Sequence, residues 1–108
     1  MQACLICLAL LMGQMDLQSK PVAHLPPHRN YIGNQFGGKL LELIDAPAVV
    51  SLPEAPPRLD SHRVPWEIDI KNLGPQAVSV VSRSGFRLTI HVGQTVHISW
   101  NGAFYSRK

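Results

Sequence analysis

Three short patterns carry residue types and spacings that indicate chemistry, and the first is rich in glycine. Gly33, Gly38 and Lys39 match the first seven positions of the loop with which nucleotide-hydrolysing proteins cradle phosphates. The eighth position needs a serine or threonine hydroxyl for Mg²⁺, and here it is Leu40. The preceding residues 28–32 also do not read as a buried strand. We therefore interpret the stretch as a glycine turn that precedes an apolar segment.

A second pattern imitates a zinc site made of two cysteines and two histidines. Cys4 and Cys7 precede His24 and His28, but the sixteen residues between Cys7 and His24 exceed the usual spacing of about twelve. Two prolines separate the histidines, where a helix would have to present both rings on one face. We predict neither a zinc site nor a redox cysteine pair here, and we predict no cofactor for the chain.

The last pattern with metal chemistry is the histidine pair His91 and His97. A three-residue turn at residues 93–95 would place the two histidines opposite each other on neighbouring strands. Cross-strand partners have Cβ atoms about 5 Å apart, which suits two imidazoles on one metal. The pattern supplies no third ligand, because Asp69 and His62 are only guesses. We interpret the pair as surface histidines, and the alternative is a weak metal site or a pH-sensitive contact between subunits.

The sequence contains no catalytic constellation. No nucleophile stands beside a base, and no pair of carboxylates occupies a recognisable catalytic frame. Glu67 and Asp69 flank Ile68, and we interpret them as a solvated pair on the exposed face of a strand. The chain is therefore predicted not to be an enzyme.

Five large aromatic side chains are the candidate binding or interface residues. They are Trp66, Phe86, Trp100, Phe104 and Tyr105. At alternating positions such residues belong mostly to the core, but some could form an exposed platform for a sugar or a partner chain. Because Phe104 and Tyr105 are neighbours, they point to opposite faces of a strand, so we expect one of them to be exposed or interfacial.

Length and composition limit what can position these residues. The chain has 108 residues, of which 45% are hydrophobic and 16% charged, with nine prolines and eight glycines. One small domain fits this length. The values exclude a membrane bundle, a long coiled coil, a charged disordered tail and most enzyme folds, which need about 150 residues or more.

The positive charge is confined to the C-terminal part of the chain. Residues 1–65 carry five basic and five acidic side chains, whereas residues 66–108 carry five basic and two acidic ones. These basic residues are single and spaced, without a run of lysine or arginine. We interpret them as a solvated strand face and expect no nucleic-acid partner.

The N-terminal segment 1–19 contains an unbroken apolar run at residues 3–12. Ten residues are too few to span a bilayer, which takes about 20, so no transmembrane span is predicted. The run suits the hydrophobic region of a secretory signal peptide, although no lysine or arginine precedes it and no Ala-x-Ala follows it. The alternatives are a buried or partner-facing apolar segment and a misassigned start.

Residues 20–65 are predicted to form a proline-rich extended arm. Eight of the nine prolines fall here, and proline interrupts regular hydrogen-bonded ladders. A short apolar segment at residues 39–52 interrupts the arm. Within it we expect residues 39–44 to form a short helix or strand and residues 48–52 a short strand.

Residues 66–108 are predicted to form a small all-β domain, because apolar and polar residues alternate with period two. Five short strands joined by tight turns would give an antiparallel meander, sandwich-like or barrel-like, with Asn101 and Gly102 at a hairpin turn. About 40 residues lie near the lower limit for independent folding. The apolar face must be covered by segment 39–52 or by copies of the chain, and we favour a homo-oligomer.

The stretch 66–105 resembles the small β-modules of phage tail-fibre and other virion proteins. The resemblance rests on a strand that ends in Asn72-Leu-Gly, a valine-rich strand, the turn Gly93-Gln-Thr-Val96, and Asn101-Gly102 before an aromatic residue. It covers about 40 of the 108 residues. Secreted bacterial β-sandwich modules share the Asn-x-Gly-Pro and Gly-Gln-Thr-Val features. The resemblance implies a non-enzymatic, often trimeric module and carries over no functional residue.

Two functions follow as predictions. The first is a structural or attachment subunit of a virion-like or extracellular assembly, which acts through self-association of the β domain or with other assembly subunits. The alternative is a secreted or periplasmic monomeric β-sandwich module that binds a glycan or a protein. Both place the protein in a virion or in an extracellular or periplasmic location.

Overall fold

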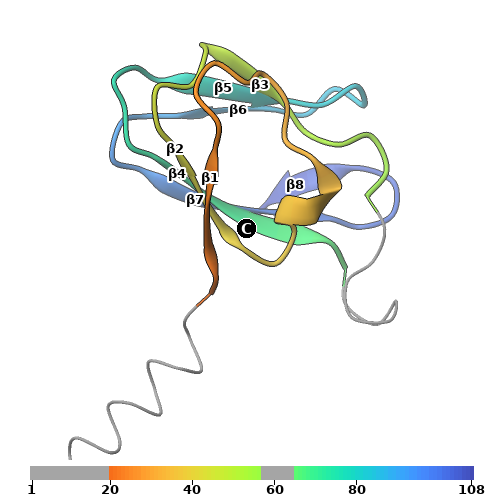
Figure 1. Ribbon diagram of the computed structural model, residues 1–108. Helices are drawn as coiled ribbons and strands as arrows, with labels where there is room; N and C mark the ends of the chain where they lie inside the picture. Colours follow the sequence, from red (N-terminus) through yellow and green to blue (C-terminus); the bar gives the residue numbers. More distant parts are fainter. Residues whose placement is uncertain (1–19, 57–64) are drawn as a thin grey trace, which may run out of the picture.

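The computed structural model describes residues 20–56 and 65–108, which form eight strands in two stacked sheets (Figure 1). The strands are β1 (Val22–Leu25), β2 (Leu40–Leu43), β3 (Val49–Ser51), β4 (Glu67–Asn72), β5 (Val78–Val81), β6 (Arg87–Ile90), β7 (Thr95–Trp100) and β8 (Tyr105–Arg107). A short 3₁₀ turn, η1 (Asn34–Phe36), precedes β2. The described residues contain no α-helix, and the predicted all-β class is confirmed.

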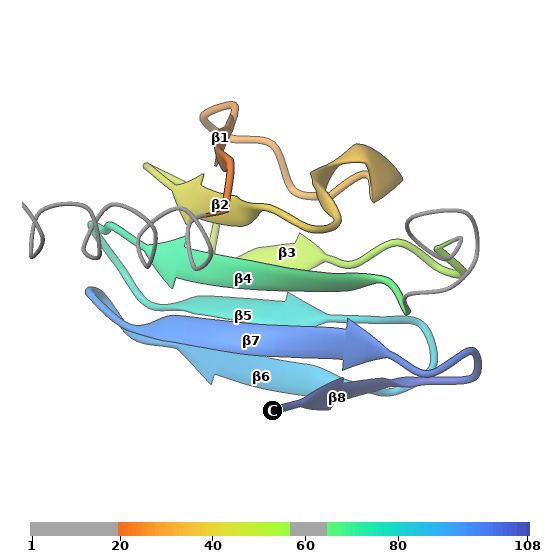
Figure 2. The same cartoon turned by 90° about the horizontal axis from the view of Figure 1, so that it is seen from below.

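Both sheets are mixed. The larger sheet has the order β1-β2-β4-β7-β8, in which β1, β2 and β4 are parallel and β7 and β8 are antiparallel to their neighbours. The smaller sheet has the order β3-β5-β6, with β3 parallel to β5 and β6 antiparallel to β5. Figure 2 shows the outer face of the larger sheet, with β4 beside β7 and β8 at the edge.

The predicted sandwich-like architecture is confirmed, but the single antiparallel meander is corrected to two mixed sheets. All five strands expected in residues 66–108 form, and β5–β6 and β7–β8 are hairpins. However, β4 pairs with β7 and not with β5, because the chain crosses from the larger to the smaller sheet after β4 and returns after β6. A single meander would leave its apolar face in water, whereas two stacked sheets cover each other's apolar faces.

The proline-rich residues 20–56 contribute strands to both sheets where we expected an extended arm. β1 and β2 extend the larger sheet, and β3 extends the smaller one. The apolar segment 39–52 supplies β2 and β3, so both of the expected short elements form, the first as a strand and not as a helix. The prolines of this part lie between the strands, where a missing N–H interrupts no ladder.

One buried cluster forms the core between the sheets. The strand side chains that face inward include Leu41, Leu43, Ile68, Ile70 and Ile98 from the larger sheet, which are 0% exposed. Val50, Val78, Val80 and Ile90 oppose them from the smaller sheet. The apolar face that we expected to need a second copy is therefore covered within one chain.

Buried Asn72 ties the sheets together at one end of the sandwich, which we call the Asn72 end. Its side chain is 0% exposed. Its amide donates hydrogen bonds to the carbonyl oxygens of Gln76 (2.8 Å) and Ile90 (2.9 Å), and its Oδ1 accepts one from the Gly74 N–H (2.9 Å). Ile90 belongs to β6 of the smaller sheet, so one amide joins the β4–β5 turn to both sheets.

The segment expected as a signal peptide, residues 1–19, lies outside the described residues, as do Cys4, Cys7 and His62. Within residues 20–56 and 65–108, no helix has the length and hydropathy needed to cross a membrane.

Candidate functional site

Four of the five predicted aromatic residues gather at the opposite end of the sandwich, which we call the Trp100 end. The ring of Tyr105 lies at their centre, with ring centroids at 4.7 Å from Trp100, 6.0 Å from Phe86 and 6.1 Å from Trp66. Trp66 and Tyr105 are buried core residues, while Phe86 and Trp100 are partly buried against the core. Trp66 and Tyr105 are therefore scaffold residues, whereas Trp100 lines a pocket.

The glycine-rich stretch packs on the edge of Trp66. The Trp66 indole N–H donates to the carbonyl oxygen of Asn34 at 3.0 Å. A Cβ added at Gly37 would lie 2.2 Å from Trp66 Nε1, so only glycine allows this approach. The stretch that matches part of a phosphate loop thus positions Trp66 and with it the start of β4.

Tyr105 fastens the strand β8 to the chain that follows β3. Its hydroxyl donates a hydrogen bond to the carbonyl oxygen of Pro53, and burial raises the pKa of the Tyr105 hydroxyl above its ordinary value. The hydroxyl therefore stays protonated and keeps its donor role. Because Pro53 lies two residues before Ala55, this bond holds one wall of the neighbouring pocket.

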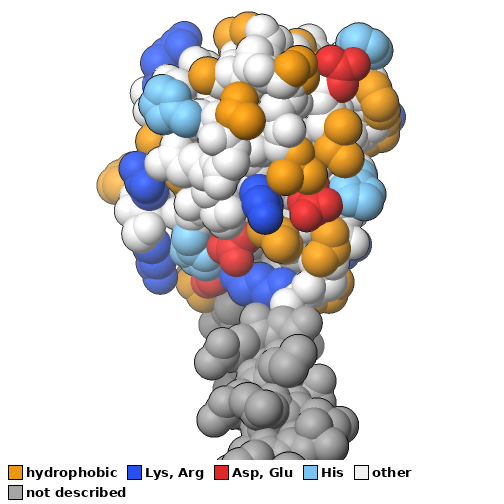
Figure 3. Space-filling model, turned by 90° about the vertical axis from the view of Figure 1, so that its left-hand side faces the viewer, with side chains coloured by type: hydrophobic (Ala, Val, Ile, Leu, Met, Phe, Trp, Pro, Cys, Tyr) orange, Lys and Arg blue, Asp and Glu red, His pale blue; other side chains and the backbone are white. Residues whose placement is uncertain are grey.

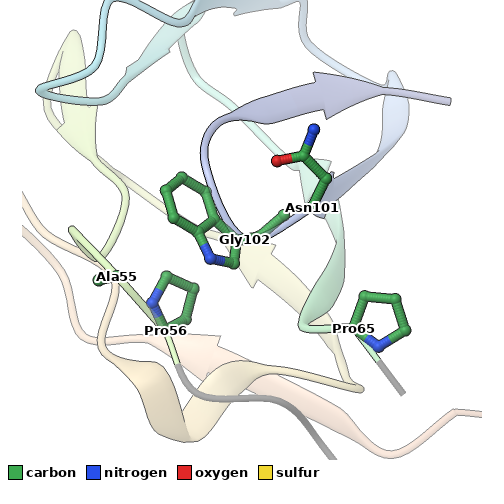
Figure 4. Close-up of a pocket in the computed structure, with 6 residues that line it drawn as sticks. Ala55, Pro56, Pro65, Asn101 and Gly102 are labelled. Atoms are coloured by element: carbon green, nitrogen blue, oxygen red, sulfur yellow. The ribbon is translucent and has the colours of Figure 1, made fainter. Parts of the chain in front are cut away.

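A pocket of about 440 Å³ opens beside Trp100. It is lined by Ala55, Pro56, Pro65, Trp100, Asn101 and Gly102. Figure 4 shows the rings of Pro56 and Pro65 on either side of Gly102. Its volume lies in the range of ligand pockets, about 300 to 1,000 Å³. The described residues of the lining include no charged side chain, so they suit an apolar or ring-shaped group better than a phosphate or a carboxylate.

The loop that closes the pocket is organised by Asn101. Its Oδ1 accepts hydrogen bonds from the N–H groups of Ala103 (2.8 Å) and Phe104 (2.9 Å), and Gly102 has a φ of 101°. Because Trp100 pairs with Tyr105, the predicted hairpin loop consists of the four residues 101–104. Of these four residues, only Gly102 has a positive φ. Phe104 is 56% exposed and Tyr105 is buried, which confirms that one of the two is exposed.

A network of charges occupies the outer face of the larger sheet. The two ring nitrogens of His97 contact Glu67 Oε1 (2.9 Å) and Asp69 Oδ1, and Lys20 Nζ lies 2.9 Å from Asp69 Oδ2. Burial alone would raise the pKa of Asp69, but the hydrogen bonds and charges of Lys20 and His97 outweigh it and hold the pKa below its ordinary value.

The predicted facing of His91 and His97 is corrected by the strand pairing. His97 lies opposite Asp69 on β4, whereas His91 follows β6 at the turn back to the larger sheet. Of the other histidines, His24 contacts Glu42 at 2.7 Å and His28 lies 3.8 Å from Asp45. In the part of the chain that the structure describes, no three His, Cys, Asp or Glu side chains are arranged to hold a metal ion.

The sequence interpretation found Trp100 but missed its neighbours. The proline pattern predicts only an extended arm for Pro56 and Pro65, and the Asn-Gly pattern predicts only a turn at Asn101 and Gly102. The one local signal that could have indicated this pocket is Pro65, because it directly precedes the aromatic residue Trp66. The interpretation of Glu67 and Asp69 as a solvated pair missed His97, because the pairing of β4 with β7 was not foreseen.

Comparisons of the chain with protein-family models, with curated proteins and with solved structures give no match. The fold and the site define a small mixed β-sandwich with an apolar pocket at one end. The resemblance to phage tail-fibre modules stays a prediction.

Proposed function

We propose that the chain is a non-enzymatic β-sandwich module that binds a protein partner through the pocket at Trp100. The observation that carries this proposal is the hollow of about 440 Å³ between Trp100 and two prolines at the end of a rigidly packed sandwich. Apolar pockets of this kind accept a proline, aromatic or aliphatic side chain of a partner. Exposed Phe104, in the loop that closes the pocket, adds apolar surface beside it.

A protein ligand is favoured over a glycan because the described lining offers few hydrogen-bonding side chains. A sugar needs donors and acceptors for its hydroxyl groups. Among the described residues of the lining, only Trp100 and Asn101 carry polar side-chain groups, and the Asn101 oxygen already accepts two backbone hydrogen bonds within its loop. The other described lining residues are alanine, proline and glycine.

The proposal is tested by NMR on the full chain with three small probes: N-acetylprolinamide, N-acetyltryptophanamide and methyl β-glucopyranoside. We expect the indole N–H signal of Trp100 to shift in a saturable way with the amides. The indole of Trp66, which is bonded to Asn34, is the internal control and stays in place. Saturable shifts with the glucoside and not with the amides would indicate that the pocket binds a glycan and not a protein.

Matched proline variants test whether the pocket itself is used. Pro65→Glu places a charge at the pocket wall and is expected to abolish the amide-induced shifts, because the charge would be desolvated by the ligand. Pro26→Glu changes an exposed proline at the Asn72 end and is expected to leave them unchanged. Equal shifts in both variants would overturn the assignment of the pocket.

Self-association is a second candidate function, as the structural or attachment subunit of a virion-like or extracellular assembly. Ile44, Leu73 and Val92 are between 43% and 54% exposed on loops of the Asn72 end. These loops are joined by the bonds Leu73 N–H to Leu43 O (2.9 Å) and Gly93 N–H to Asn72 O (2.6 Å). Figure 3 views this end, where hydrophobic side chains lie among charged ones and histidines.

Light scattering of the full chain across a dilution series tests this second candidate. A closed oligomer that Leu73→Ser converts to monomers would favour the structural subunit. A monomer at every concentration would remove this candidate and leave the binding module.

A further inference from the structure

Four strands form the edges of the two sheets: β1 and β8 in the larger sheet, and β3 and β6 in the smaller one. Among the described residues, a further segment lies beside β3 alone. At the β3 side, residues 30–32 run beside the edge: Ser51 N–H donates to Asn30 O at 2.9 Å and Ile32 N–H donates to Ser51 O at 2.8 Å. At the other side, β6 and β8 are the edges of the two sheets, and among the described residues no strand lies beside either. Figure 2 shows β6 and β8 on this same side, and the rings of Phe86 and Tyr105, at the starts of the two strands, lie 6.0 Å apart.

The free hydrogen-bonding groups of β8 follow from its register. Antiparallel strands alternate between residues that bond to the partner and residues that point away from it. Lys108 N–H donates to His97 O at 2.8 Å, and Asn101 N–H donates to Phe104 O at 3.2 Å. The main-chain groups of Phe104 and Lys108 therefore point toward β7. The main-chain N–H and C=O groups of Tyr105 and Arg107 point to the open side.

The charged side chains of β6 and β8 are all basic. No acidic residue follows Asp69 in the sequence, and the exposed side chains of Arg87, Arg107 and Lys108 flank the two edges. A second copy that paired through β8 would bring Arg107 and Lys108 against the same residues, and like charges on paired strands repel. An acidic segment would instead be attracted.

We propose that the open edge of β8 binds an extended acidic peptide segment as an added strand. Tyr105 and Arg107 supply the main-chain donors and acceptors, and Arg87, Arg107 and Lys108 supply the complementary charge. This mode of recognition takes its affinity from main-chain hydrogen bonds and its selectivity from the flanking side chains. The edge begins beside the pocket at Trp100 but shares none of its lining residues.

The probe is the peptide acetyl-Thr-Glu-Val-Glu-Val-Glu-Thr-amide, titrated into the full chain and followed by NMR and by hydrogen exchange. We expect saturable binding that protects the amide protons of Tyr105 and Arg107. The same peptide with lysine in place of glutamate is expected to bind at least about tenfold more weakly, because its charge is reversed. A peptide N-methylated at every residue keeps the charge but has no N–H group left for pairing, and it is expected to protect neither amide.

Two substitutions of one residue separate charge from pairing. Arg107→Gln removes the charge and keeps the N–H, so we expect weaker binding with less salt dependence. Arg107→Pro also removes the outward N–H, which takes no part in the β7–β8 ladder, so we expect loss of saturable binding in a folded protein. Pro65→Glu, which disables the pocket, is expected to leave the binding of this peptide unchanged. This variant therefore distinguishes a failure of the pocket proposal from a failure of the β8 proposal.

Three results would overturn the proposal. Equal binding of the N-methylated peptide would mean attraction by charge alone. Binding that Arg107→Pro does not change would exclude the β8 edge. A concentration-dependent dimer that Arg107→Pro abolishes would make a second copy the occupant.

Discussion

Each end of the sandwich is organised by one asparagine, and the two asparagines differ in burial. Asn72 is fully buried and bonds to residues of both sheets, whereas Asn101 is exposed and bonds only within its own loop. When a buried amide is removed, its former partners are left without any hydrogen bond. When an exposed amide is removed, its former partners can bond to water instead. The Asn72 end therefore holds the sheets together, and the Trp100 end can carry a pocket.

Asn72→Ala is the strongest test of this difference. It leaves the Gly74 N–H and the carbonyl oxygens of Gln76 and Ile90 without their partner in a dry environment. We expect the free energy of unfolding to fall by about 3 kcal/mol, measured by urea denaturation with an unchanged m value. A loss of stability no larger than that of Asn101→Ala would contradict the claim that Asn72 contributes more to stability than Asn101.

Gly37→Ala tests the packing behind the pocket. The added Cβ would lie 2.2 Å from Trp66 Nε1, and a buried indole cannot move aside without opening the core. We expect a loss of about 2 kcal/mol, measured in the same way. Gly33→Ala is the matched control, because its added Cβ would meet the flexible side chain of Gln35. Equal losses in the two variants would show that Trp66 is not held by the glycine turn.

Asn101→Ala is expected to cost less than the two buried changes. The Ala103 and Phe104 N–H groups lose their acceptor but remain exposed to water. We expect a loss of about 0.5 kcal/mol in the free energy of unfolding. The variant should instead weaken the response of Trp100 to N-acetylprolinamide, since the loop closes the pocket. A loss of stability with intact ligand response would contradict this role of the loop.

Asp69→Asn probes the charged face that lies between the two ends, and its effect depends on pH. The pKa of Asp69 in the folded protein lies below that of an unfolded aspartate, about 3.9. The ionised carboxylate therefore stabilises the folded state above that pH, and this stabilisation is lost as the pH falls through the folded pKa. We expect the variant to lose about 1 kcal/mol near pH 6 and nothing at the acid end of a urea-denaturation series.

Exposed Asp45 provides the control for the charged face. It lies 3.8 Å from His28, and both side chains are largely exposed. Asp45→Asn is therefore expected to change the free energy of unfolding near pH 6 by less than Asp69→Asn does. A pH dependence that survives in Asp69→Asn would assign the effect to another carboxylate.

Much of the local structure could be predicted from the sequence, because strand alternation and turn chemistry act over a few residues. The alternation of Ile68 and Ile70 with Glu67 and Asp69 predicted a half-buried strand, and β4 buries the expected side chains. The exposure of either Phe104 or Tyr105 was also predicted from their adjacency, and Phe104 is the exposed one. Which of the two would be buried was not predictable, because it depends on the face that meets the core.

The candidate site could be predicted only in part. Trp100 was among the predicted residues, but the pocket also needs Ala55 and Pro56, which lie more than forty positions earlier in the chain. No local pattern connects residues so far apart. They meet because the chain after β3 is held against β8 by the Tyr105 hydroxyl, a contact across the two sheets.

Within residues 66–108, the sequence by itself determined which residues form strands and which side of each strand is apolar, because side chains alternate faces along any extended backbone. Only the tertiary structure decided which strands pair. The pairing depends on how all the apolar faces are covered at once, and here two mixed sheets cover each other where one antiparallel sheet would not. That choice placed His97 opposite Asp69, left β8 at an open edge and formed the pocket beside Trp100.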